Sequence, residues 1–188
     1  MSTAVRISVA EFEATIDRGD FAVDDPRLFE LIDGELIEMP RPKPPHEEAT
    51  DKLGNWGVRA VPLGQVRVRV QGSLGIPDLD SVPFPEASWL YERDYSERRP
   101  LPSDVLLVIE VSDSTLSYDR NRKARLYAAA GLADYWIANI KGRCVEVRRD
   151  PGPKGYKKKS IFHPGDEIRP LALPEVAFPV SLIFPEAI

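Results

Sequence analysis

A glutamate closes the most hydrophobic run of the chain. The run Val105-Leu106-Leu107-Val108-Ile109 is short and rich in β-branched residues, which predicts a buried β-strand over 105–111 that includes Glu110. A carboxylate in such a strand loses much of its hydration. We therefore expect Glu110 to be protonated, paired with a cation or coordinated to a metal, and the last two options are typical of a chemical site.

The segment that follows this strand supplies a candidate cation. A helix is predicted over 116–130, and helical spacing puts Lys123 on the same stripe as Asp119 and Tyr127, turned toward the sheet. The other face carries Arg120, Arg122 and Arg125. A lysine facing a sheet needs an anionic neighbour, and Glu110 is one candidate. The alternative is an exposed Asp119–Lys123 pair at i, i+4, worth only about 0.2–0.5 kcal/mol.

A metal held by Glu110 would need a second carboxylate from a neighbouring segment. Glu86 lies inside a predicted strand over 83–91, whereas Asp78 and Asp80 lie in a predicted loop over 71–81. A residue on a strand is held more rigidly, which favours Glu86. Asp78 and Asp80 can also serve simply as turn formers.

The composition limits the metals that can bind. Cys144 is the lone cysteine, and His46 and His163 are the two histidines, so neither a cysteine-rich zinc site nor a multi-histidine centre is indicated. A bound metal is expected to be a hard ion that prefers oxygen ligands, Mg²⁺ or Mn²⁺. No organic cofactor is expected.

Hydropathy and cysteine content indicate the cellular location of the protein. No run of eighteen apolar residues and no basic-then-apolar leader is present, so no membrane span or signal peptide is predicted. A lone cysteine suits a reducing compartment, and the cytoplasm is the expected location.

The charge distribution predicts a surface for phosphates. The net charge is −5, and acidic residues predominate over residues 1–55, but the segment 141–159 is strongly basic. Together with the helix arginines, this segment could form one basic face. The predicted nucleic-acid-binding residues are Arg120, Arg122, Lys154, Lys157, Lys158 and Lys159. The alternative is a solvated hairpin that is basic by chance.

The remaining elements follow from periodicity and from proline and glycine. They are a helix over 8–16, strands over 28–32 and 35–39 around a turn at Asp33-Gly34, a proline-rich loop over 40–45, a helix over 46–59, a strand over 65–70, and strands over 135–140, 144–149 and 155–162. This order predicts an α/β (α+β) protein with a mixed central β-sheet flanked by helices, an N-terminal hairpin and a C-terminal β-meander. A single domain over 1–188 is expected from the length.

Several segments resemble a known family. They are Phe29–Met39, Pro83–Glu86, Val108–Thr115, Asp119 with Lys123 and Tyr127, and Ala130–Ile137. In order and spacing they are similar to the Uma family of endonucleases, which belongs to the PD-(D/E)XK, restriction-endonuclease-like superfamily. The likeness spans roughly residues 8–184, nearly the whole chain.

The resemblance implies roles for individual residues. Glu86 and Glu110 correspond to the two acidic residues of the superfamily core and would be its metal ligands. Ser112 stands where the superfamily usually has its lysine, and the resemblance implies that Lys123 takes this role from the helix. The further candidate site residues are Glu30, Glu35, His46, Asp78, Asp80, Asp119 and Tyr127.

Glu86 is a departure from the family pattern, which normally has aspartate there. The extra methylene moves the carboxylate by about one C–C bond, and a misplacement of about an ångström can cost roughly a hundredfold in rate. Either the metal shifts to suit Glu86, Asp78 or Asp80 substitutes for it, or the site is weakened.

The resemblance implies a metal-dependent DNA endonuclease. Its partners would be DNA and a second copy of the chain. The second copy is expected by analogy with the superfamily and from the apolar C-terminal strands. One alternative is a catalytically weak or inactive nuclease-fold protein that binds DNA or protein. Another is a protein in which the Glu110–Lys123 pair only stabilises the core.

Overall fold

The computed structural model describes residues 6–20 and 28–185. Its helices are α1 (Val9–Asp17), α2 (Pro44–Ala60), α3 (Leu116–Tyr118) and α4 (Ala124–Ala129), with a π-helical turn over Asp119–Lys123 that joins the last two. Its strands are β1 (Leu28–Ile32), β2 (Glu35–Met39), β3 (Val66–Val70), β4 (Ala87–Tyr91), β5 (Val105–Ser112), β6 (Asp134–Asn139), β7 (Cys144–Gly152), β8 (Gly155–Phe162), β9 (Glu167–Ile168) and β10 (Phe178–Pro179). Within the described ranges, no helix is both long and apolar enough to cross a membrane.

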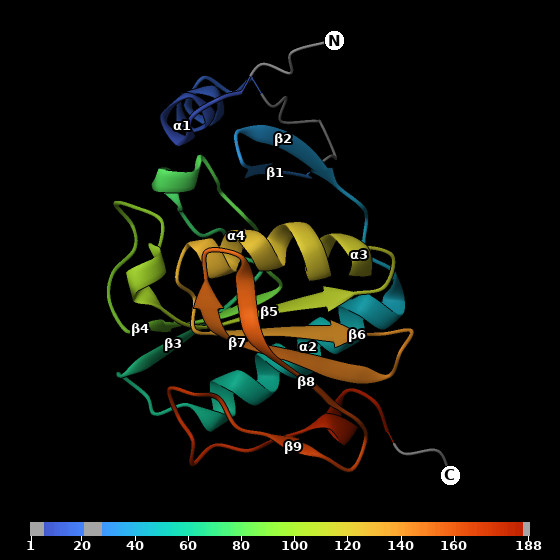
Figure 1. The fold of residues 1–188 in the computed structure, drawn as a ribbon. Coiled ribbons are helices and arrows are strands. Elements are labelled where there is room, and N and C mark those ends of the chain that lie inside the picture. Colours follow the sequence, from blue (N-terminus) through green and yellow to red (C-terminus); the bar gives the residue numbers. More distant parts are fainter. Residues whose placement is uncertain (1–5, 21–27, 186–188) are drawn as a thin grey trace.

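A six-stranded mixed sheet forms the centre of the molecule (Figure 1). Its order is β3-β4-β5-β6-β7-β8, and the pair β5–β6 is parallel while the other pairs are antiparallel. A parallel pair needs a crossover connection, and the helical segment from α3 to α4 provides it. The predicted mixed sheet, the N-terminal hairpin β1–β2 and the C-terminal meander β6-β7-β8 are confirmed.

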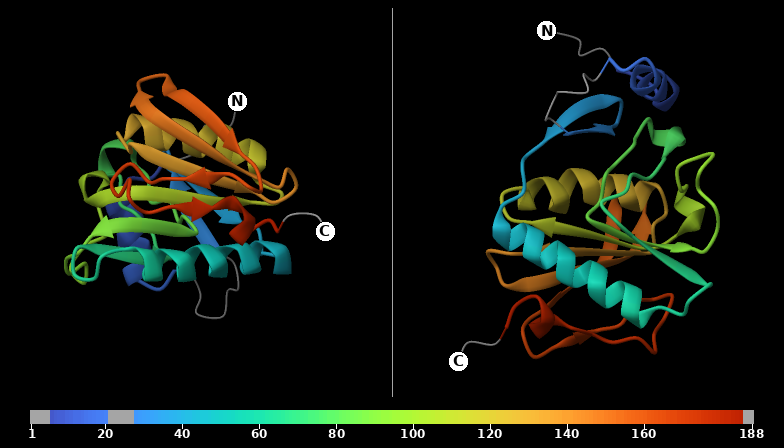
Figure 2. Two further views of the ribbon diagram at one scale, coloured as in Figure 1. Left: turned by 90° about the horizontal axis from the view of Figure 1, so that it is seen from below. Right: turned by 180° about the vertical axis from the view of Figure 1, so that it is seen from behind.

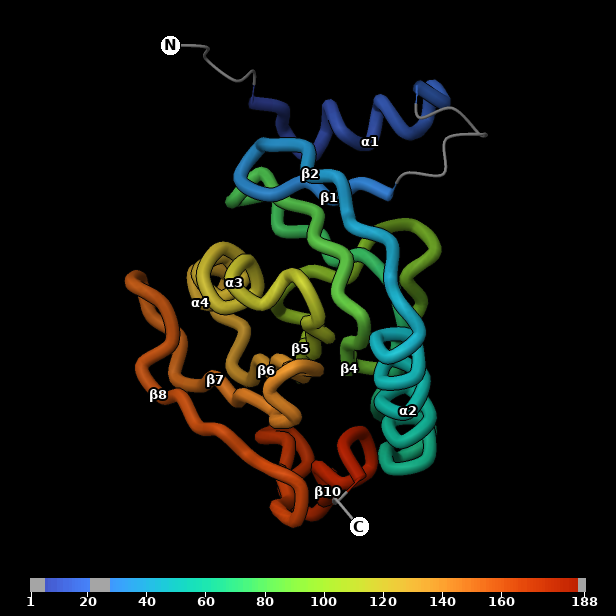
Figure 3. The backbone as a smooth tube through the Cα atoms, turned by 90° about the vertical axis from the view of Figure 1, so that its right-hand side faces the viewer, coloured from blue at the N-terminus to red at the C-terminus, as the bar shows by residue number. Residues whose placement is uncertain are grey.

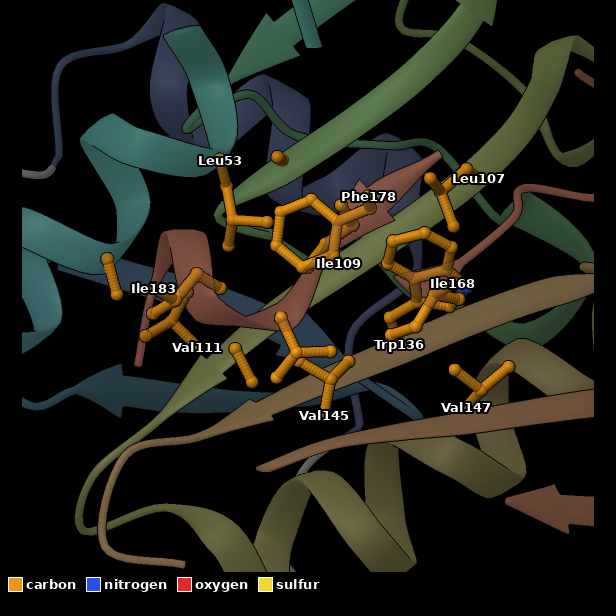
Figure 4. Close-up of a cluster of buried hydrophobic side chains, with 14 of the residues drawn as sticks. Leu53, Leu107, Ile109, Val111, Trp136, Val145, Val147, Ile168, Phe178 and Ile183 are labelled. Carbon is orange, nitrogen blue, oxygen red and sulfur yellow. The ribbon is translucent and has the colours of Figure 1, made fainter. Parts of the chain in front are cut away.

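The two faces of the sheet are covered by different elements (Figure 2). One face packs on α2 and the C-terminal segment, with Leu107 and Ile109 of β5 in this core (Figure 4). The other face packs on α4, with Val108 of β5. Because successive side chains of a strand point to opposite faces, Glu110 shares the face of Val108 and points toward the helical crossover.

Two boundaries differ from the sequence prediction because of prolines. Helix α2 begins at Pro44, inside the segment that was predicted to be a loop, because the first helical positions have no intrahelical use for an N–H group. Strand β4 begins at Ala87, so Glu86 precedes the strand and does not lie within it. Pro83 and Pro85 cannot donate ladder hydrogen bonds, which delays the start of the strand.

The C-terminal segment also differs from the prediction. Residues 180–182 form a 3₁₀ turn, and Phe178, Val180 and Phe184 are buried in the core against α2 and the sheet. These apolar residues are therefore buried within the chain's own core. They do not form the exposed strands on which the expectation of a homodimer partly depended.

Candidate active site

The acidic pair is set by the register of β4 on β5. Ala87 lies opposite Ile109 in this antiparallel pair, so one step further along Glu86 is the cross-strand neighbour of Glu110. The side chain of Glu110 is only 1% exposed. The two carboxyl groups interact with each other at the end of β5.

Lys123 is the cation of the site. Its Nζ lies 2.9 Å from Oε1 of Glu110 and 3.2 Å from Oε2 of Glu30. The lysine is buried. The prediction that it faces the sheet and pairs with Glu110 is confirmed, and the alternative of an exposed Asp119–Lys123 pair is wrong.

Glu30 reaches the site from the N-terminal hairpin. It is 2% exposed, and its Oε1 accepts a hydrogen bond from the Tyr118 hydroxyl at 3.0 Å. Its Oε2 accepts another from the backbone N–H of Phe84 at 3.2 Å. The Tyr127 hydroxyl donates to Oε1 of Glu110 at 2.7 Å. Each carboxylate therefore has donors that fix its orientation.

Glu86 is held by contacts that suit its length. Oε1 lies 3.1 Å from Nε2 of His46, and Oε2 accepts a hydrogen bond from the backbone N–H of Val111 at 3.0 Å. The backbone carbonyl of Glu86 accepts from the N–H of Gln71 at 2.9 Å. The side chain is thus anchored although it lies just outside the strand.

The two carboxyl groups of the acidic pair have pKa values shifted in opposite directions. Burial raises the pKa of Glu110 well above its usual range; Lys123 opposes this effect and Glu86 adds to it. Burial also acts to raise the pKa of Glu86, but hydrogen bonds with His46 and Glu110 outweigh it and lower the pKa to about 2. Of the two carboxyl groups, Glu110 therefore takes up a proton more readily, and Glu86 is the one that ionises first.

The two bases of the site have raised pKa values. Burial acts to lower the pKa of Lys123, but Glu110 and Glu30 raise it well above its usual value, so the lysine is charged. Burial likewise opposes protonation of His46, and the hydrogen bond and charge of Glu86 more than compensate, which raises the pKa of His46.

The π-helical turn places Asp119 and Lys123 together on the buried side of the crossover. Asp119 is 2% exposed, and its Oδ2 accepts hydrogen bonds from the hydroxyl groups of Ser112 at 2.5 Å and Thr115 at 2.7 Å. Burial raises the pKa of Asp119. Since π-turns are common at functional sites, this feature agrees with a chemical role for the segment.

These groups line a cavity of about 480 Å³. Its floor carries Glu30, Glu86, Glu110, Asp119 and Lys123. Its walls come from the β1–β2 hairpin, the approach to β4 and α3, and its rim includes the proline-rich segment before α2. Elements from separate parts of the sequence thus enclose one cavity with an acidic floor.

Other predicted residues are not brought to this cavity. Glu35 forms an ion pair with Arg122 at 2.8 Å, outside the lining. Asp78 and Asp80 are exposed in and after a 3₁₀ turn, and Asp80 has a positive φ of 42°. They serve as turn residues, so the structure gives no support to their replacing Glu86.

The predicted basic face is divided between internal ion pairs and the far edge of the sheet. Arg120 pairs with Glu146 at 2.5 Å. The β8 strand lies on the side of the sheet opposite to the β2–α2 connection (Figure 3), and no described residue of 141–159 lines the cavity. Lys157 and Lys159 point to one face of β8 and Lys158 to the other. Lysines on an edge strand also discourage pairing with other chains.

Sequence reasoning missed two cations at the rim, Arg41 and Lys43. Both are exposed and line the cavity, and neither forms an ion pair within the described ranges. Their signal was the alternation with Pro40, Pro42 and Pro44. Residues before proline are restricted to extended conformations, which holds successive basic side chains in a fixed relation.

The fold and the site together define a nuclease-like protein, with an acidic pair on adjacent strands and a lysine on the following crossover helix. The chain belongs to the Uma2 family, described as "Putative restriction endonuclease", which it matches over residues 11–181. The resemblance found in the sequence is thereby confirmed.

A solved structure shows the same fold. It is described as a "putative nuclease belonging to DUF820 from Anabaena variabilis ATCC 29413", is 17% identical, and aligns over 83% of this chain and 89% of that chain with a TM-score of 0.67. No curated protein sequence matches the chain. The structural likeness supports the fold alone, and the chemistry has to be argued from the site.

The donor set of the cavity fits a hard cation. Glu86 and Glu110 are neighbouring oxygen donors, and a divalent cation competes with protons for such carboxylates. Among the described residues, no group of three or more histidine, cysteine or acidic side chains is arranged around a metal position. Mg²⁺ commonly binds through one or two carboxylates and completes its shell with water and substrate phosphate, so two ligands suffice.

Proposed function

We propose that the protein is a metal-dependent endonuclease that hydrolyses phosphodiester bonds of DNA. The observation that carries this proposal is the contact of the Lys123 ammonium with Glu110 at 2.9 Å, beside Glu86, on the floor of an open cavity. Family membership supports the nuclease class. The metal and the DNA substrate are the parts that we add.

Glu86 and Glu110 would hold Mg²⁺ or Mn²⁺ in this cavity. When bound, such an ion polarises a phosphate and lowers the pKa of a water molecule. Glu86 is presented by His46 and by the N–H of Val111, and Tyr127 orients Glu110. These contacts preorganise the two carboxylates before a substrate arrives.

Lys123 would stabilise the charge that develops on the phosphate. Its ammonium group is buried, its pKa is raised, and Glu30 contacts it at 3.2 Å. A fixed cation in a site shielded from water stabilises negative charge much better than a solvated one does. Glu30 is therefore a positioning residue in this proposal.

A cleavage assay on plasmid and on single-stranded DNA with Mg²⁺ or Mn²⁺ tests the proposal. We expect metal-dependent cleavage that Glu110→Gln and Lys123→Met abolish and that Lys158→Ala, a change on the far edge strand, leaves intact. Cleavage that persists in Glu110→Gln would remove this cavity from the reaction.

A nuclease-fold binding protein without activity is the second candidate. It is favoured by the closure of the site through internal hydrogen bonds, since both oxygens of Glu86 are engaged. On this proposal DNA binds without being cut under any metal condition. A purified protein that retards DNA but does not nick it with either metal would favour this candidate.

A further inference from the structure

The candidate reacting groups are deeply buried. Glu110 is 1% exposed, Glu30 2% and Lys123 4%. The cavity that leads to them has a volume of about 480 Å³, within the range of roughly 300–1,000 Å³ that suits single small molecules. A paired nucleotide within a helix cannot enter such a space, because base pairing ties it to the second strand.

One wall of the cavity is apolar. It is made by Ile37 and Met39 of the hairpin, by Phe84 before β4 and by Tyr118 of α3. All four side chains are half-buried, so part of each faces the open space. The Tyr118 ring is held by the hydrogen bond of its hydroxyl to Glu30, and the backbone of Phe84 is held by its N–H bond to the same residue. Rigid aromatic rings in a groove are surfaces on which unpaired bases stack.

The rim adjacent to this wall carries two cations beside the exposed Glu38. Arg41 and Lys43 are exposed and have no acidic partner among the described residues. Lys43 is in an extended conformation, with φ −111° and ψ 161°, and the flanking prolines limit its alternatives. The first turn of α2 adds no anion site here, because Pro44 and Pro45 lack N–H groups. Arg41 and Lys43 are therefore the exposed cations of the described lining that can bind phosphates.

We infer that the site takes an unpaired strand of DNA. One nucleotide enters the cavity with its base against Phe84 and Tyr118, and Arg41 and Lys43 hold the phosphates of its neighbours at the rim. A nucleotide outside a helix can turn its phosphate down toward Glu110, which a paired one cannot do. This inference rests on the proposed function and adds the class of substrate.

Fluorescence anisotropy with labelled oligodeoxynucleotides tests the inference in Ca²⁺, which is itself a hard, oxygen-binding cation. The three probes are a single strand, a full duplex, and a duplex with an internal unpaired loop. We expect the single strand and the loop to bind at least about tenfold more tightly than the duplex, and Phe84→Ala to weaken the binding of the single strand about tenfold. Equal or tighter binding of the duplex overturns the inference, as does the absence of binding to all three probes.

Salt dependence gives a second readout that does not depend on the core. In the double variant Arg41→Ala/Lys43→Ala, the slope of log K against log salt for the single strand should fall by about 1.4, about 0.7 for each lost phosphate contact. Arg125→Ala, an exposed arginine on α4 outside the cavity lining, is the matched control and should leave the slope unchanged. An unchanged slope in the double variant removes the rim from the inference.

Cleavage separates this inference from the proposed function. With Mn²⁺, cuts should map to the single strand and to the loop. Cuts placed equally within the duplex would overturn the inference and leave the proposed function standing. A preference for the single strand in binding, with no cleavage by either metal, would overturn the proposed function and leave the inference standing.

Discussion

Among the described residues, Lys123 has the only ammonium group that contacts Glu110 and Glu30, and replacing it with methionine removes that group. The change keeps an unbranched side chain and deletes contacts of 2.9 Å and 3.2 Å in a buried environment. Breaking a buried ion pair costs about 3–5 kcal/mol, because the partner charge remains buried and unpaired. We expect a value near the lower end, about 3 kcal/mol at neutral pH, because Glu110 already has a raised pKa and can take up a proton.

Thermal unfolding measures this loss. For a chain of this size, about 3 kcal/mol corresponds to a decrease in Tm of roughly 6–12 °C. Lys52→Met is the matched control, since Lys52 pairs with Glu48 at 3.1 Å on the surface of α2 with side chains 33% and 65% exposed. That variant should lose at most about 0.5 kcal/mol. Equal losses in the two variants would refute the assignment of Lys123 to a buried charge cluster.

The same variant separates a catalytic from a structural role. If Lys123 stabilises the reacting phosphate, Lys123→Met should lower the rate of cleavage by orders of magnitude. Its affinity for Mn²⁺ should hold or rise, because a cation that competes for the carboxylates has gone. A folded Lys123→Met protein that cuts DNA at the parental rate would contradict the catalytic assignment.

Three further predictions concern the acidic pair. Titration calorimetry should show Mn²⁺ binding with release of protons, and Glu110→Gln should weaken it sharply; unchanged affinity would exclude Glu110 as a ligand. Glu86→Asp should lower Mn²⁺-dependent nicking by about tenfold or more, because the shorter side chain cannot keep its contacts with His46 and the N–H of Val111. Increased nicking would instead mark Glu86 as a misfit. Because the pKa of Glu110 is raised above 4.5 in the folded state, its contribution to stability is complete below that pH and declines as the pH rises toward the folded pKa. The unfolding free energy of the wild type relative to Glu110→Gln should therefore fall as the pH rises above about 4.5, by up to about 1.4 kcal/mol per pH unit, whereas a constant difference would show that Glu110 has an ordinary pKa.

Local patterns predicted the two central residues of the site. The apolar run before Glu110 predicted a buried strand, and a buried carboxylate there required a partner. Helical spacing put Lys123 on the stripe that faces the sheet, which holds even though the crossover contains a π-helical turn. Both inferences needed only periodicity and the energetic demand of a buried charge.

Predictions about exposed charges depended on information that the sequence does not display. Arg120 and Arg122 were expected to bind phosphates, yet they pair with Glu146 and Glu35 from distant strands. The lysines of β8 lie at the far edge of the sheet. A basic segment can attract phosphate. Only the packing of the chain decides which of its basic side chains are already paired with acidic groups of the protein.

By itself, the sequence determined the family, the order of most elements and the faces on which Glu110 and Lys123 lie, because each of these follows from residue type and short-range period. The tertiary structure alone decided that Glu30 and His46 join them. It also decided that Asp78, Asp80 and Glu35 do not, and that Arg41 and Lys43 lie at the rim of the cavity. These contacts join the hairpin, α2, the sheet and the crossover. They depend on the register of β4 against β5 and on how the layers pack, and neither is encoded in the spacing of residues along one segment.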